Sequence, residues 1–205
     1  MYVTEEKQVV RPAMPIGTKS HGSVDERSTI YLDIETSSLD ADSGIVISVG
    51  YALGNSEPTV MSVRSYDDEK QVIANIFEKV KNTTLVTFNG SNFDIPFLIS
   101  RGLKYGYYFP RVEMLDLYLW ARRYLRFQSR RFHDICLFYG IPHEDISGKE
   151  MNELFIRAIS GDVNAWHRIT DHLTQDIKAM QAFHNRIGPL LEDYPPPGWE
   201  FTRSE

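Results

Sequence analysis

The spacing of hydrophobic and polar residues changes along the chain. Early on, three apolar runs with strand-like alternation are separated by short turns, which predicts an antiparallel meander made of Thr29–Ile34, Ile45–Leu53 and Thr59–Tyr66. From Asp67 the apolar residues recur with the period of a helix. Further on, strands are expected at Thr83–Phe88 and within Arg111–Leu119, and helices at Asp67–Lys81, Phe93–Tyr105, Phe132–Tyr139, Lys149–Ser160 and Asp162–Arg186.

A meander followed by alternating helices and strands predicts an α/β fold, with a mixed sheet covered by helices on both faces. We expect this domain to occupy residues 28–190. Residues 1–27 are polar and show no periodicity, so they are expected to form a flexible arm. Residues 191–205, which contain three consecutive prolines, are expected to form a tail.

The composition narrows the class of protein. The 205 residues fit one domain, and 42% hydrophobic with 24% charged residues is ordinary for a soluble protein. No apolar run is long enough to span a bilayer, no signal peptide is evident, and the single cysteine excludes an internal disulfide. We therefore expect a cytoplasmic protein without a membrane partner. The net charge of −6 argues against coating nucleic acid through bulk charge, but it allows an acidic centre masked by metal.

Two carboxylates stand two residues apart in the first predicted strand. Asp33 and Glu35 share one face of that strand, because side chains at i and i+2 point the same way. Like charges held so close repel one another unless cations neutralise them. Mg²⁺ or Mn²⁺ could neutralise these carboxylates, because both ions bind oxygen ligands. The alternative is a strand end whose acids extend into water.

Two further patterns carry carboxylates. In residues 87–98 a strand ends, a polar turn follows and a helix opens, so Asp94 lies in a first helical turn, where the helix dipole favours an anion. On the last helix His172 and Asp176 are one turn apart, at the edge of the apolar stripe that includes Leu173 and Ile177. The alternatives are an ordinary helix start and an ordinary polar border.

Taken together, the three patterns resemble the motifs of the DEDD superfamily of 3′-to-5′ exonucleases, which have a ribonuclease H-like fold. D-I-E-T at 33–36 is similar to the first motif. F-N-G-S-N-F-D-I-P-F-L at 88–98 is similar to the second, especially as it occurs in the exonuclease domain of family-B DNA polymerases. Asp176 matches the aspartate of the third. The resemblance extends from Ser28 to about Ile187, with the motifs in the expected order.

The resemblance implies that two Mg²⁺ or Mn²⁺ ions are held by Asp33, Glu35, Asp94 and Asp176. One departure concerns His172, which stands where the tyrosine-bearing branch has tyrosine in Y-x-x-x-D. A neutral imidazole accepts a proton from water more readily than a phenol does, so we expect His172 to act as the general base or to orient the water. The competing interpretation is a weakened active site.

Several residues near the motifs are candidates for binding substrate. The first two motifs contain four such candidates, Thr36, Phe88, Asn89 and Phe93, although Phe88 and Phe93 fit a core equally well. A basic cluster surrounds the aromatic residues Tyr124 and Phe127. It comprises Arg122, Arg123, Arg126, Arg130 and Arg131. These arginines could bind a phosphate backbone, with the aromatic rings stacking on bases, or they could form a solvated helix face.

The sequence thus predicts a metal-dependent 3′-5′ exonuclease acting on 3′ ends of single-stranded nucleic acid, DNA rather than RNA. The chain ends soon after the third motif, so we expect a stand-alone nuclease or a subunit of a larger assembly. Two alternatives stay open: a structure-directed nuclease with the same metal centre, and a nuclease-like module that binds nucleic acid without turnover. No pattern indicates a protein partner or an oligomeric state.

Overall fold

The computed structural model describes residues 28–65 and 67–196. The arm expected at 1–27 lies outside the described residues, as does the part of the expected tail from residue 197 onward. Within the described ranges, no helix has the length and apolar character needed to cross a membrane.

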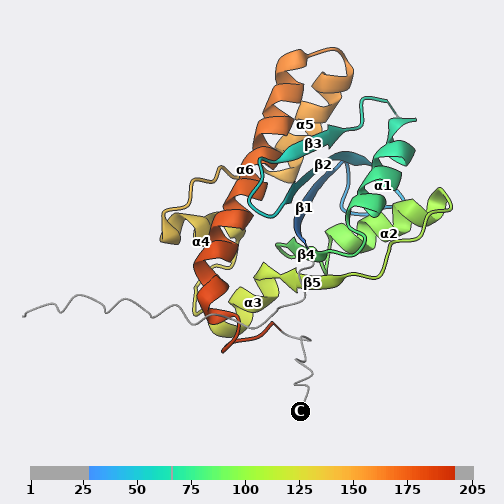
Figure 1. Cartoon of the computed structure of the whole chain (residues 1–205). Coiled ribbons are helices and arrows are strands. Elements are labelled where there is room, and N and C mark those ends of the chain that lie inside the picture. The colour runs from blue at the N-terminus through green and yellow to red at the C-terminus, as the bar shows by residue number, and fades with distance from the viewer. Residues whose placement is uncertain (1–27, 66, 197–205) are drawn as a thin grey trace, which may run out of the picture.

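Five strands form one mixed sheet in the order β3-β2-β1-β4-β5 (Figure 1). The first three are antiparallel neighbours, as the meander predicted, whereas β4 pairs in parallel with β1 and with β5. Their bounds are β1 Thr29–Thr36, β2 Val46–Leu53, β3 Thr59–Ser62, β4 Thr84–Thr87 and β5 Glu113–Asp116.

Helices cover both faces of the sheet, which confirms the predicted fold class. On one face lie α1 (Asp68–Lys79) and α2 (Asp94–Lys104), and on the other the long helix α6 (Val163–Ile187) runs across the strands (Figure 1). Three shorter helices, α3 (Leu117–Tyr124), α4 (Phe132–Tyr139) and α5 (Gly148–Ile159), complete the layer on the α6 side, and a short 3₁₀ turn, η1 (Gly188–Leu190), follows α6.

Strand β1 separates two parts of the core by its alternation. Ile30, Leu32 and Ile34 pack into the cluster beneath α1 and α2, whereas Tyr31 belongs to the cluster beneath α6. Because alternate side chains share a face, Asp33 and Glu35 point to the α6 side with Tyr31.

Helix α6 approaches the sheet closely at Gly50 of β2, the residue paired with Asp33. A Cβ atom at this position would lie 3.2 Å from Ile177 Cγ1 and 3.3 Å from Leu173 Cβ. Such contacts are tighter than those of most side chains, so glycine lets the helix backbone rest against the centre of the sheet. Asp176, which neighbours Ile177 in the helix, is thereby brought close to β1.

The third strand is shorter than predicted. The sequence pattern continued to Tyr66, but β3 ends at Ser62. The backbone N–H groups of Arg64 and Ser65 donate to Asp68 Oδ2, at 3.1 and 2.9 Å, instead of continuing the ladder. The carboxylate at the start of α1 thus redirects the chain out of the sheet edge.

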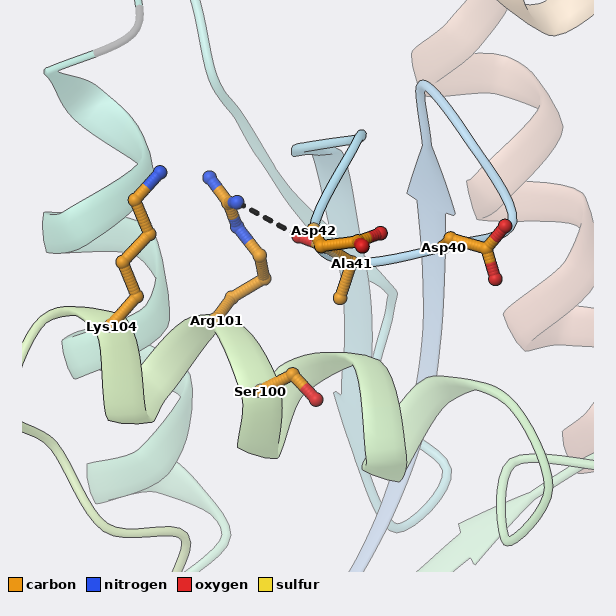
Figure 2. A pocket seen from close by; sticks show the side chains of 6 residues that line it. All are labelled: Asp40, Ala41, Asp42, Ser100, Arg101 and Lys104. Atoms are coloured by element: carbon orange, nitrogen blue, oxygen red, sulfur yellow. Dashed lines mark hydrogen bonds between the residues drawn. The ribbon is translucent and has the colours of Figure 1, made fainter.

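A buried ion pair ties the loop between β1 and β2 to both helices of the opposite face. Arg101 of α2 donates to both carboxylate oxygens of Glu69 in α1, at 2.8 and 2.5 Å. It also donates to the carbonyl of Ala41, at 2.9 Å, as Figure 2 shows. Glu69 also accepts from Tyr105 and from the backbone N–H of Val46. Because Glu69 is fully buried, each of its oxygens depends on these partners.

Replacing Glu69 by Gln leaves the guanidinium of Arg101 buried without its counter-charge. We expect the free energy of unfolding, measured in urea, to fall by about 3–5 kcal/mol, the usual cost of breaking a buried pair. The matched control is Glu78→Gln on the same helix, because Glu78 pairs with Lys81 in the open and should change stability by less than about 1 kcal/mol. Equal losses in the two variants would contradict the structural role assigned to Glu69.

Candidate active site: a cluster of carboxylates and histidines

A cavity of about 190 Å³ opens where β1 passes under α6. Its walls come from β1, the end of β4, the start of α4, the loop before α5 and the middle of α6. The residues that line it are Asp33, Ile34, Glu35, Phe88, Phe132, His143, Asp145, His172, Asp176 and Met180. Carboxylate and imidazole groups therefore dominate its polar lining, and aromatic rings form one side.

Residues from the first and third sequence motifs meet in this cavity. His172 Nε2 lies 3.2 Å from Glu35 Oε1 and 3.3 Å from Asp176 Oδ2. Glu35, His172 and Asp176 each offer one ligand atom within 4.8 Å of the others, the spacing expected of groups that share a metal ion. His172 and Asp176 of α6 therefore lie beside Glu35 of β1.

The second motif supports the cavity from behind. Asp94 lies in the first turn of α2, as predicted, and its Oδ1 accepts a hydrogen bond of 3.1 Å from the backbone N–H of Ile34. Asp94 is 4% exposed and is not one of the residues lining the cavity. Its charge nevertheless reaches Asp33, where it is the largest electrostatic influence after burial.

The carboxylates resist ionisation in each other's presence. Burial raises the pKa of Asp33 well above its ordinary value, and the charges of Asp94, Asp176 and Glu35 raise it further. Burial also raises the pKa of Glu35, although the hydrogen bond from His172 opposes this. For His172, burial alone would lower the pKa, but the hydrogen bond with Glu35 and the charge of Asp176 outweigh it, so the pKa is raised.

The donor set fits a hard divalent cation. Carboxylate oxygens are the ligands that Mg²⁺ and Mn²⁺ prefer, and the imidazole of His172 stands beside them. Two buried polar atoms of the cluster, His172 Nδ1 and Asp176 Oδ1, have no aligned hydrogen-bond partner in the structure. A cation would relieve the repulsion that raises the carboxyl pKa values, because opposite charge favours the ionised form.

The turn of the second motif is held by Asp116, a residue outside the three motifs. Asp116 accepts hydrogen bonds from the backbone N–H groups of Asn89 and Ser91, at 2.9 and 3.0 Å, and also caps α3. Asn89 has a φ of 63°, a left-handed conformation that asparagine tolerates better than most residues. Asp116 thus fixes the path of the chain from β4 into α2.

The residues expected to bind substrate divide into two groups. Phe88 lines the cavity and packs against Phe132, with ring centroids 4.3 Å apart. Phe93 instead packs with the cluster beneath α1 and α2, and the Thr36 hydroxyl donates to the carbonyl of Ser38. Asn89 forms the turn, through its backbone and its side chain.

The arginine cluster lies away from the cavity lining. Arg122 and Arg126 are exposed, and neither lines the cavity. The two aromatic residues expected to stack bases there are engaged in packing: the Tyr124 hydroxyl donates to the carbonyl of Pro195, and Phe127 packs against Phe138 and Tyr139. A phosphate contact by the exposed arginines stays a prediction.

Four cavity residues lie outside the sequence motifs, and one of them, Met180, is a buried residue of α6. Phe132, His143 and Asp145 come from the start of α4 and from the loop between α4 and α5. The loop has no periodicity, so its only signal in the sequence was the presence of an imidazole and carboxylates in a short polar stretch.

A second, polar hollow between the β1–β2 loop and α2 includes Arg101, which already binds Glu69, and offers no comparable cluster (Figure 2).

Comparison with known proteins agrees with this fold. Residues 30–187 match the family model described as the RNase_H superfamily, whereas no curated protein matches the chain. The fold is similar to that of the family B DNA polymerase from the hyperthermophilic archaeon Pyrobaculum calidifontis, with a TM-score of 0.71 and 16% identity. The match covers 84% of this chain and 26% of that chain, so the chain spans about a quarter of the polymerase. The expected ribonuclease H-like fold is confirmed.

The buried Asp94 makes the stability of the metal-free protein depend on pH. Burial raises its pKa to about 7; hydrogen bonds from the backbone N–H groups of Asp94 and Ile34 oppose the increase, and the charges of Glu35 and Asp116 add to it. Between its ordinary pKa of 3.8 and about 7, the folded protein holds a proton that the unfolded chain has lost. Stability therefore falls as the pH rises through this interval.

Asp94→Asn keeps the oxygen that accepts from Ile34 and removes the ionisation. In EDTA the variant should match the wild type near pH 4 and exceed its free energy of unfolding by roughly 2–4 kcal/mol near pH 8. Urea denaturation across this range measures the difference. A stability difference that does not change with pH would contradict the raised pKa of Asp94.

Proposed function

We propose that this chain, which belongs to the RNase_H superfamily, is a divalent-metal-dependent nuclease that removes nucleotides from the 3′ end of single-stranded nucleic acid, DNA in preference to RNA. The observation that carries the proposal is the meeting of Glu35, His172 and Asp176 within 4.8 Å, in a cavity that Asp33 also lines. Nucleases with a ribonuclease H-like fold use divalent metals, and this cluster offers the ligands for them.

The proposed metal ligands are Asp33, Glu35, Asp94 and Asp176. Two bound ions would supply activation of a water molecule and stabilisation of the departing 3′ oxygen. Each of the four carboxylates contributes charge to the centre, and Asp94 acts from behind β1. Without cations the four carboxylates repel one another. Relief of this repulsion would supply a large share of the free energy of metal binding.

His172 has the proposed role of orienting the attacking water and accepting its proton. The imidazole stands between Glu35 and Asp176, so its ring is held in place by two carboxylates. A histidine can accept a proton near neutral pH, and bound cations would lower the pKa that the carboxylates have raised.

The preference for an unpaired strand end rests on the shape and lining of the cavity. With about 190 Å³ it is small, and the rings of Phe88 and Phe132 form one wall. Aromatic rings stack on unpaired bases, whatever the sequence. A terminal base that enters this cavity must leave its partner, which favours single strands and ends over intact duplex.

A second candidate function is a nuclease-like module that binds nucleic acid ends without turnover. His172 at the position of the expected tyrosine is the observation that favours it. Such a module would bind an oligonucleotide in the presence of Mg²⁺ but would release no nucleotide. A structure-directed nuclease on the same centre would instead cut circular single strands, which have no 3′ end.

The first test is a time course on 5′-labelled single-stranded DNA, the matching RNA and circular single-stranded DNA, with Mn²⁺, Mg²⁺ or EDTA. We expect a ladder that shortens from the 3′ end of linear DNA and requires metal, with slower loss of RNA and intact circles. Asp33→Asn and Asp176→Asn should each lower the rate by at least about 100-fold, because each removes a metal ligand. Full activity in either variant would overturn the site assignment, and intact oligonucleotides under every metal would favour the binding module.

His172→Tyr separates the two roles of the imidazole. If the residue only orients water, the phenol should keep the rate within about tenfold of wild type near pH 8. If the imidazole accepts the proton, the rate should fall by about 10²–10⁴-fold, and the pH–rate profile should lose its limb near neutrality. Single-turnover rates measured between pH 6 and 9 distinguish these outcomes, with exposed His167→Tyr on the same helix as the control.

A further inference from the structure

A second imidazole contacts the metal-ligand cluster from a loop outside the three motifs. His143 lies between α4 and α5, and its Nε2 atom is 2.8 Å from Asp176 Oδ1. The side chain of His143 is 5% exposed, so this contact is sheltered from water. Among the residues that line the cavity, His143 and His172 are the two that can carry positive charge, since neither lysine nor arginine lines it.

The two oxygens of Asp176 therefore face different partners. Oδ2 lies toward His172 and Glu35, which are its companions in the candidate metal cluster. Oδ1 faces His143 at short distance, but the ring is not aligned for a hydrogen bond. A buried carboxylate oxygen without a donor costs free energy, so a small rotation of the imidazole that completes the bond is favourable.

The loop is anchored on both sides of His143. The neighbouring Glu144 receives two hydrogen bonds from Arg168 of α6, at 3.0 and 2.6 Å. Asp145, which also lines the cavity, pairs with Arg131 at the start of α4. Three consecutive loop residues thus have partners in neighbouring helices. His143 contacts Asp176 and Glu144 binds Arg168, both on α6, and Asp145 pairs with Arg131 at the start of α4.

The imidazole itself is also confined. The ring of Phe132 meets it edge to face, with centroids 5.0 Å apart, and His133 Nδ1 lies 3.4 Å from His143 Nδ1. A ring held by an aromatic neighbour and by the loop has few orientations available. These contacts keep Nε2 at 2.8 Å from Asp176 Oδ1, so that only a small rotation is needed to complete the hydrogen bond.

We propose that His143 is a positioning residue for Asp176: its Nε2–H holds Oδ1 so that Oδ2 remains free to bind a metal ion. The inference rests on the proposed function, because it concerns a ligand of the proposed metal centre. Hydrogen bonds to the outer oxygen of a ligating carboxylate fix its direction, and the loss of such a partner typically weakens metal binding 10–100-fold.

The test compares two substitutions of similar size. His143→Gln keeps an N–H donor near the position of Nε2, whereas His143→Leu removes it. Mn²⁺ binding to the nucleic-acid-free protein, measured by calorimetry, should be about 10–100-fold weaker for His143→Leu and within about threefold of wild type for His143→Gln. The Mn²⁺ concentration for half-maximal cleavage should move in parallel, while KM for DNA at saturating Mn²⁺ stays unchanged.

The control is His167→Leu, because His167 is exposed on α6. Thermal melting in EDTA verifies that each variant is folded. Equal Mn²⁺ affinities for the Gln and Leu variants would overturn the inference. A raised KM with unchanged Mn²⁺ affinity would overturn it too, by indicating that His143 contacts substrate. Wild-type protein that neither binds Mn²⁺ nor cleaves DNA would instead overturn the proposed function itself.

Discussion

Repulsion among buried carboxylates is the constraint on which the site depends. Asp33, Glu35, Asp94 and Asp176 come from three different elements, and burial raises the pKa of the first three. A fold that only had to be stable would not collect these groups at one end of a central strand, because removing an ion from water costs several kcal/mol. The proposed function accounts for this arrangement, because bound cations would offset the repulsion among the carboxylates.

The fold meets this constraint by using the two faces of β1 differently. One face is wholly apolar and packs beneath α1 and α2, while the other changes from Tyr31 to Asp33 and Glu35 as the strand leaves the core. Helix α6 then crosses this second face, and Gly50 lets it approach closely enough for His172 and Asp176 to meet the strand carboxylates. Ordinary packing of the apolar stripe of α6 thus sets the geometry of the polar site.

Imidazoles moderate the charge of the cluster from two directions. His172 lies between Glu35 and Asp176, and His143 approaches the other oxygen of Asp176 from the loop before α5. The carboxylates raise the pKa of His172, and bound cations would lower it again, so this imidazole could balance the carboxylates without metal and lose its proton when ions bind. Lysine or arginine in these positions would compete permanently with the ions.

The sequence by itself determined the fold class, the order of elements and most of the carboxylate cluster. These features follow from local periodicity: alternation put Asp33 and Glu35 on one face, and the helical period put His172 beside Asp176. Boundaries were displaced where side chains capture backbone groups, as Asp68 does at the end of β3. Only the tertiary structure assigned His143 to the site and separated Phe88 in the cavity from Phe93 in the core. Loop residues and aromatic rings leave no period in the sequence, and their neighbours are decided by how distant elements pack.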